Sequence, residues 1–308
     1  MAEDLRIIFM GTPDFAVPTL QVLVESGYPV VAVITAPDKP AGRGLKLVQS
    51  PVKEYALSRQ IPVLQPTNLK DEAFLEELRS YRASLQVVVA FRMLPEAVWS
   101  MPAKGTFNIH ASLLPQYRGA APINWALING EKESGVTAFF LQHQIDTGDI
   151  ILQQKVAITE DDNFGTLYEK LKHAGAALAL QTVEAIAAGT VATQPQPLSQ
   201  ELKAAPKIFK ETCEINWQQP AAQVRNFIRG LSPYPAAWTM LEGKVLKVFA
   251  AELVSTDSPD AGPGTFWSDN KTYLHFATAA GTLSLTDLQL EGKKRMTIAE
   301  FLRGYRFK

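Results

Sequence analysis

An amide and an imidazole lie two residues apart near the middle of this chain, at Asn108 and His110, and an acidic turn follows at Asp146. Within a β-strand, a spacing of two places both side chains on the same face. The amide can donate a hydrogen bond, the imidazole can donate one or carry a proton, and the carboxylate can hold a charge. These three groups can catalyse acyl transfer without a metal or a covalent nucleophile.

Each of these groups alone has an ordinary structural explanation. A single histidine on a strand is usually a structural residue, and the acidic turn at 146–149 alone would be a plain loop. The combination favours a site, because we expect Asn108 and Asp146 to lie where α/β folds place ligands. Those places are the carboxyl ends of strands near a change in strand order.

The elements that would carry these residues alternate between strand and helix along the first two thirds of the chain. Apolar runs read as buried strands, and helical patterns with caps separate several of them. This alternation predicts an α/β fold with a Rossmann-like, mostly parallel sheet. The expected strands include 5–11, 30–35, 85–91, 106–111 and 136–141, and the expected helices include 72–82, 122–129 and 166–188.

The length of 308 residues predicts two domains. We expect a catalytic domain at 1–189, a proline-containing linker at 190–206 and a second domain at 207–308. Short alternating runs separated by turns predict a small β-barrel of the oligonucleotide-binding (OB-like) type in the second domain. The net charge of −1 gives by itself no reason to suspect nucleic acid.

The single cysteine, Cys213, excludes an intrachain disulfide and is more typical of a structural residue than of a nucleophile. The first residues are acidic, unlike a signal peptide. No run reaches the ~20 apolar residues of a membrane span. These features predict a cytoplasmic protein.

Two glycine-containing segments are candidates for ligand binding. The segment that begins at Gly11 lacks the G-x-G-x-x-G fingerprint, so an NAD-dependent oxidoreductase is poorly supported. The loop that carries Lys39, Arg43 and Lys46 could hold phosphates, arginine by bidentate pairing. An ordinary solvated loop explains these cations equally well.

Four segments together resemble the methionyl-tRNA formyltransferase branch of the folate-dependent formyltransferase family. They are GTPDFA at 11–16, DKPAGRG at 38–44, NIHASLLPQYRGAAPI at 108–123 and DTGD at 146–149. The similarity runs the length of the chain. The Asn-x-His…Asp set belongs to the whole family and points to formyl transfer, while the basic loop and the second domain point to tRNA.

The resemblance implies that the formyl group moves from 10-formyltetrahydrofolate to the α-amine of initiator methionyl-tRNA. Asn108 and His110 would stabilise the oxyanion, and Asp146 would orient His110 and favour its charged form. The family suggests a monomer, and neither an acyl-enzyme nor a metal is expected. The folate would contact Ser112, Leu113, Leu114 and Pro115, and the tRNA would contact Lys39, Arg43, Lys46 and Lys207.

One departure from the family is visible at 90–95, where the aromatic-Gly segment common after the third strand is one residue shorter and lacks its glycine. Two further alternatives stay open. The first is the same chemistry on a small amine, such as a ribonucleotide or an amino sugar. The second is a non-catalytic RNA-binding protein, although the second domain lacks a dense basic and aromatic face in sequence.

Overall fold

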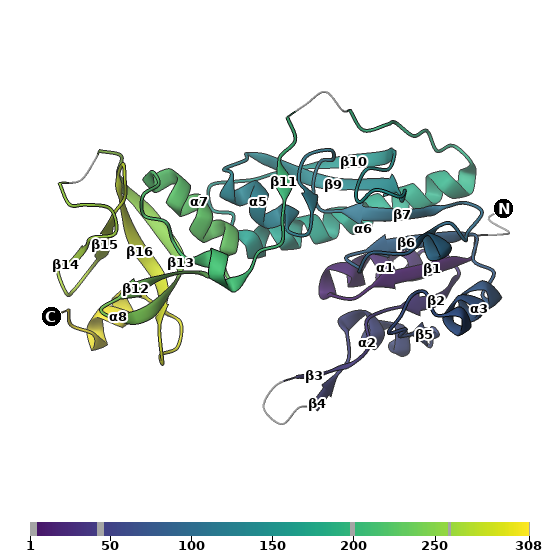
Figure 1. Ribbon diagram of the computed structural model, residues 1–308, viewed down its shortest axis with the longest axis horizontal. Helices are drawn as coiled ribbons and strands as arrows, with labels where there is room; N and C mark the ends of the chain where they lie inside the picture. The colour runs from purple at the N-terminus through teal and green to yellow at the C-terminus, as the bar shows by residue number, and fades with distance from the viewer. Residues whose placement is uncertain (1–4, 42–45, 198–200, 258–259, 308) are drawn as a thin grey trace. The chain divides into compact units, whose positions relative to one another are not determined.

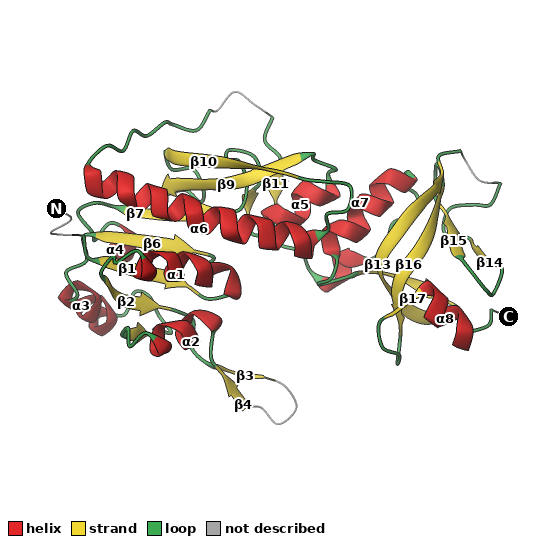
Figure 2. Cartoon of the chain, turned by 180° about the vertical axis from the view of Figure 1, so that it is seen from behind, coloured by secondary structure: helices red, strands yellow, loops and turns green. Residues whose placement is uncertain are grey.

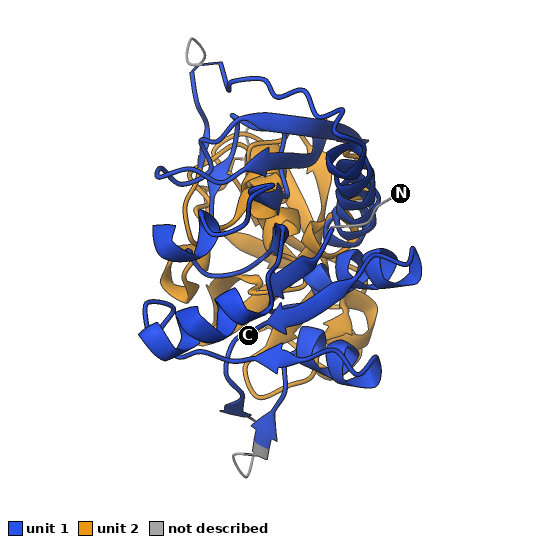
Figure 3. Ribbon diagram, turned by 90° about the vertical axis from the view of Figure 1, so that its right-hand side faces the viewer, with its two compact units in different colours: residues 1–119, 134–156, 168–204 blue, residues 120–133, 157–167, 205–308 orange. Residues whose placement is uncertain are grey.

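The computed structural model describes residues 5–41, 46–197, 201–257 and 260–307. The chain packs into two compact units, which Figure 3 distinguishes by colour. Unit 1 comprises 1–119, 134–156 and 168–204, and unit 2 comprises 120–133, 157–167 and 205–308. Two segments from within the predicted catalytic domain, 120–133 and 157–167, therefore pack with unit 2.

Unit 1 is built on a seven-stranded sheet with the order β10-β9-β7-β6-β1-β2-β5 (Figure 1). The neighbours from β7 through β5 are all parallel, while β9 runs antiparallel to β7. The predicted mostly parallel sheet is thus confirmed. The strands are β1 (Ile7–Gly11), β2 (Val30–Ile34), β5 (Val63–Leu64), β6 (Leu85–Val89), β7 (Thr106–His110), β9 (Glu133–Phe140) and β10 (Ile150–Ala157).

Local sequence signals fix the helices of unit 1. Ser50 caps α2, its hydroxyl accepting from the Lys53 amide, and Asp71 caps α3, its carboxylate accepting from the Phe74 amide. The unit also contains a two-stranded hairpin, and a short strand, β8, pairs with β11 where the chain passes between the units. The remaining elements are η1 (Asp14–Ala16), α1 (Val17–Glu25), β3 (Lys39–Ala41), β4 (Lys46–Val48), α2 (Pro51–Ser58), α3 (Glu72–Ser80), α4 (Glu96–Trp99), β8 (Arg118–Gly119) and β11 (Ala204–Ala205).

The long helix α6 (Phe164–Ala188) covers one face of this sheet, beside β7 and β9 (Figure 2). Gly175 permits a close approach, because a Cβ added there would lie 3.1 Å from Ile109 Cγ2 and 3.8 Å from Val136 Cγ1. Ile109 therefore faces α6. Since side chains alternate along a strand, Asn108 and His110 face the opposite side of the sheet.

Unit 2 contains an antiparallel sheet of six strands, β12-β13-β16-β15-β14 with β17 on β16. This half-barrel confirms the predicted small β-barrel. Its core includes Cys213 and Trp217, and α7 packs against α5, where the Asn124 amide donates to the Gly230 carbonyl. The elements are α5 (Pro122–Ile128), η2 (Lys210–Cys213), α7 (Ala221–Leu231), β12 (Ala237–Leu241), β13 (Lys244–Ser255), β14 (Phe266–Ser268), β15 (Leu274–Ala277), β16 (Thr282–Leu290), β17 (Met296–Thr297) and α8 (Ile298–Gly304).

Within the described ranges, no helix is both long and apolar enough to cross a membrane.

Candidate active site

His110 is the last residue of β7, and the residue is buried, with 7% of its surface exposed. Its Nε2 lies 2.9 Å from the Tyr117 carbonyl oxygen. A carbonyl oxygen only accepts, so this contact assigns the proton to Nε2. The other ring nitrogen, Nδ1, faces the carboxylate of Asp146 at 3.9 Å. This separation exceeds a direct hydrogen bond and leaves Nδ1 as the edge that can exchange a proton.

The Asp146 carboxylate accepts a hydrogen bond from the Gly119 amide at 3.1 Å. The backbone of Asp146 is left-handed, with φ of 54°, a conformation that aspartate tolerates better than most residues. Asp146 reaches His110, at the carboxyl end of β7, by a path that the sequence pattern did not indicate. Strand β9 is antiparallel to β7, so it ends beside the start of β7, and the turn folds back across the sheet to reach His110.

The turn at 146–149 passes so close to β9 that only glycine fits at its centre. A Cβ added at Gly148 would lie 1.6 Å from the Phe140 carbonyl oxygen. The Phe140 amide in turn donates to the Asp149 carbonyl at 3.1 Å. The backbone of this turn is therefore fixed against the sheet, and Asp146 is held with it.

Asn108 lies beside Phe139 of β9 in the strand register and is partly exposed. It shares the face of β7 that carries His110, as the two-residue spacing predicted. The structure thus brings His110 and Asp146 together and places the Asn108 amide on the same face of the strand.

The loop after β7 is held by its own hydrogen bonds. The buried Ser112 hydroxyl donates to the Gln116 carbonyl at 2.6 Å, and the Leu114 amide donates to the Thr137 hydroxyl at 3.1 Å. Ser112, Leu114 and Pro115 are buried and Leu113 is partly buried. The predicted folate contacts stay a prediction, and the Ser112 side chain would contribute by shaping the loop.

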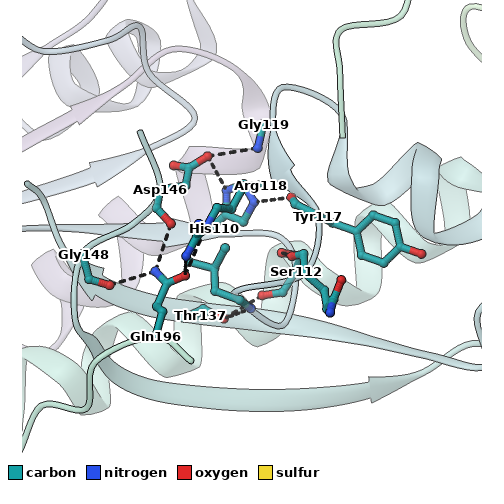
Figure 4. A network of polar contacts seen from close by, with 11 residues as sticks. His110, Ser112, Tyr117, Arg118, Gly119, Thr137, Asp146, Gly148 and Gln196 are labelled. Carbon is teal, nitrogen blue, oxygen red and sulfur yellow. Dashed lines mark hydrogen bonds and ion pairs between the residues drawn. The ribbon is translucent and has the colours of Figure 1, made fainter. Parts of the chain in front are cut away.

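Sequence reasoning missed two members of this cluster, Arg118 and Gln196 (Figure 4). The Gln196 side chain accepts from the guanidinium of Arg118 and donates to the carbonyls of Asp146 and Gly148. Gln196 lies in the stretch that we expected to be a linker, 190–206. Gln196 lies between two prolines, a context that is typical of linkers and gives no indication of a site.

The segment that departs from the family pattern follows β6. Ala90 has a φ of 48°, the left-handed region that favours the glycine this chain lacks. The Arg92 guanidinium donates to the carbonyls of Pro66 and Thr67, which ties the segment to the loop after β5. The missing glycine has therefore not prevented the turn.

The predicted tRNA-binding cations of unit 1 belong to the β3–β4 hairpin. Lys39 is exposed, whereas Arg43 and the side chain of Lys46 lie outside the described residues. At the base of the hairpin, Lys53 donates to Asp38 at 2.6 Å, and this hydrogen bond lowers the pKa of the Asp38 carboxyl. The hairpin is thus anchored to α2.

Lys207 is exposed and lines a cavity of about 980 Å³ within unit 2. Two further lysines, Lys210 and Lys247, line the same cavity together with Trp238.

Cys213 is buried in the core of the unit, and burial raises the pKa of its thiol, as expected for a structural cysteine. In the part of the chain that the structure describes, histidine, cysteine, aspartate and glutamate form no group of three able to hold a metal ion.

Two family models match this chain. The model described as "Formyl transferase" covers residues 5–183, and the model described as "Formyl transferase, C-terminal domain" covers residues 207–306. The chain belongs to the formyl transferase family. The resemblance inferred from the short motifs is thereby confirmed.

Relatives that share about half of its residues align over nearly the whole chain. A methionyl-tRNA formyltransferase of Bacteroides fragilis is 56% identical over 98% of this chain and 96% of its own length. One of Phocaeicola vulgatus is 58% identical over 99% of this chain and 97% of its own length. A crystal structure of WlaRD, a sugar 3N-formyl transferase, has the same fold, with a TM-score of 0.67 and 20% identity over 94% of this chain and 99% of that one.

Proposed function

We propose that this protein transfers the formyl group of 10-formyltetrahydrofolate to the α-amine of initiator methionyl-tRNA, giving N-formylmethionyl-tRNA for translation initiation. The observation that carries the proposal is the identity of 56% with a methionyl-tRNA formyltransferase over nearly the full length of both chains. The cluster of Asn108, His110 and Asp146 supplies groups suited to this chemistry.

The reaction would proceed through a tetrahedral intermediate. The neutral α-amine attacks the formyl carbon, the carbonyl oxygen becomes an oxyanion, and the bond from carbon to the folate nitrogen N10 then breaks. One proton leaves the amine and one reaches N10, so the reaction needs no oxidant or external acid. An α-amine pKa of ~8 leaves a usable neutral fraction at physiological pH.

Asn108, and His110 once its Nδ1 carries a proton, would donate hydrogen bonds to the oxyanion, a contribution often worth about 3 kcal/mol per donor. Because His110 Nε2 is bonded to the Tyr117 carbonyl, Nδ1 is the nitrogen available to the reacting atoms. A substrate atom or a water molecule that lies beside the pair would hydrogen-bond to both Nδ1 and the Asp146 carboxylate, which are 3.9 Å apart. Asp146 would stabilise the imidazolium when the proton arrives.

The folate would lie against the loop of Ser112, Leu113, Leu114 and Pro115. Ile145, next to Asp146, is 65% exposed and offers apolar surface to a flat ring system. A methionyl-tRNA would meet the cations Lys39, Arg43, Lys46 and Lys207, which suit phosphate groups. These substrates imply a cytoplasmic enzyme, and we further propose that it acts as a monomer without a metal.

A formylation assay tests the proposal. The protein is incubated with 10-formyltetrahydrofolate and either initiator methionyl-tRNA or small amines, namely free methionine and a nucleotide-linked amino sugar. Formylmethionine on tRNA, with little product from the small amines, is expected. Preferential formylation of the amino sugar would reject the proposed acceptor and support the small-amine alternative, and tight RNA binding without transfer from the folate would support a non-catalytic role.

A further inference from the structure

The side chain of Gln196 has all of its hydrogen-bonding capacity in use. Its Nε2 donates to the carbonyl oxygens of Asp146 at 2.9 Å and Gly148 at 2.8 Å. Its Oε1 accepts from Arg118 Nε at 3.1 Å and Nη2 at 2.5 Å. The side chain is only 6% exposed, so these bonds form largely away from water. Two donors and two acceptor positions fix the amide in one orientation.

These bonds complete a closed circuit around the catalytic pair (Figure 4). Arg118 lies in the chain between Tyr117 and Gly119. The Tyr117 carbonyl accepts from His110, and the Gly119 amide donates to the Asp146 carboxylate. Gln196 joins the Arg118 side chain to the backbone of Asp146 and so links the two sides of the circuit.

The bonds from Gln196 hold a backbone conformation that is unfavourable by itself. Asp146 has a φ of 54°, in the left-handed region that L-residues adopt less readily than glycine. Gln196 binds the carbonyls of the two residues that flank Thr147 in the turn. Without these two bonds the turn would lose part of what holds it, and the Asp146 carboxylate would be less restrained relative to His110.

We propose that Gln196 is a positioning residue for formyl transfer, which sets the separation between the Asp146 carboxylate and His110 Nδ1. This inference rests on the proposed function, because it takes His110 and Asp146 as the groups that act on substrate. Gln196 itself touches neither reacting atom. Its effect is on the geometry in which the proton moves, and small displacements in such geometry cost large factors in rate.

Glutamine supplies both the acceptor that the Arg118 guanidinium needs and the donors that the two turn carbonyls need. Glutamate has the same shape and keeps an acceptor for Arg118, but it would direct a carboxylate oxygen at two carbonyl oxygens. Methionine has a similar length without any strong hydrogen-bonding group. The variants Gln196→Glu and Gln196→Met therefore remove the bonds to the turn in two different ways, and the first retains the pairing with Arg118.

The test measures kcat and KM for initiator methionyl-tRNA and 10-formyltetrahydrofolate, together with thermal unfolding, in the wild type, Gln196→Glu, Gln196→Met and His110→Ala. Gln86→Met is the matched control. Gln86 is also buried, but its side-chain oxygen accepts from Thr106 at the start of β7 rather than bonding to the turn. We expect both Gln196 variants to lose tenfold or more in kcat with KM values within about twofold, while Gln86→Met keeps its kcat.

The inference would be overturned if His110→Ala is inactive while both Gln196 variants keep kcat within twofold of the wild type. It would also be overturned if both Gln196 variants lose activity only in proportion to the folded protein that they lose. In that case Gln86→Met would show the same loss of activity. By contrast, turnover near the wild-type rate in His110→Ala would reject the proposed roles of the catalytic pair, whatever the Gln196 variants do.

Discussion

The polar groups around His110 in unit 1 are buried or partly buried and bonded to one another, whereas the predicted tRNA-binding cations whose side chains the structure describes are exposed. His110, Asp146, Arg118 and Gln196 form one circuit of short contacts. Lys39 and Lys207 stand at the surface. This difference indicates that the two regions suit different roles. The circuit fixes a geometry in advance, and the exposed cations can attract a polyanion through charge alone.

Removing the imidazole should have the largest effect. We expect His110→Ala to lower kcat by about two to three orders of magnitude, because it removes an oxyanion donor and the partner of Asp146. Steady-state formylation of methionyl-tRNA measures the loss, and circular dichroism checks that the fold is retained. Turnover within a few fold of the wild type would break the assignment of this cluster to the chemistry.

Disturbing the turn that carries Asp146 should reduce both stability and activity. In Gly148→Ala the new Cβ would lie 1.6 Å from the Phe140 carbonyl, so the turn must shift. Overpacking of this kind typically costs ~1–3 kcal/mol. Gly262→Ala is the control, since a Cβ there meets nothing within 4 Å. Denaturant unfolding and kcat measure both effects, and equal behaviour of the two variants would show that this turn is not held tightly.

Removing a cation should weaken use of tRNA without slowing the chemical step. In Arg43→Ala we expect a severalfold higher KM for methionyl-tRNA and an unchanged KM for the folate. The slope of log(kcat/KM) against log salt should become shallower by about one unit, because one phosphate contact is lost. Lys104→Ala is a control on another surface of unit 1. The same salt slope in Arg43→Ala and the wild type would exclude a phosphate contact at Arg43.

A cluster of three surface charges in unit 2 should give the smallest effect. Hydrogen bonds from Lys132 and Arg225 lower the pKa of Glu160 to about 2. A lowered pKa stabilises the folded state above the unfolded value of ~4.3, and this contribution is lost as the pH falls through about 2. Because Glu160 is largely exposed, we expect less than about 1 kcal/mol.

Urea unfolding measures this contribution at pH 6 and at pH 2. Glu160→Gln should be slightly less stable than the wild type at pH 6 and nearly equal to it at pH 2, where about half of the Glu160 carboxylate is protonated. Arg225→Gln, which removes one of the two partners, should reduce the same pH dependence. A difference between the wild type and Glu160→Gln that persists at pH 2 would assign the effect to packing.

Much of the fold was predictable because its signals are local. The strand at 106–110 and the helix caps at Ser50 and Asp71 follow from patterns a few residues long. The face shared by Asn108 and His110 follows from the strand period. The direction of β9, and with it the path of the turn to Asp146, depends on pairing between distant segments, which no local pattern encodes.

Gln196 was beyond sequence reasoning for the same reason. Its four bonds join residues that lie 48 to 78 positions earlier in the chain. The length of the chain alone also did not identify the acceptor of the formyl group. A sugar 3N-formyl transferase covers 94% of this chain in fold, so a second domain does not by itself indicate tRNA. The high identity to methionyl-tRNA formyltransferases carries that part of the proposal.

The central claim is that His110 serves the chemistry and Arg43 serves capture of the tRNA. A single-turnover measurement with the protein in large excess over methionyl-tRNA tests it directly, because saturating protein compensates for weak binding. We predict that Arg43→Ala recovers the wild-type rate constant at saturation, while His110→Ala stays at least a hundredfold slower at every protein concentration. Recovery of His110→Ala at high concentration, or a persistent deficit in Arg43→Ala, would contradict this division of roles.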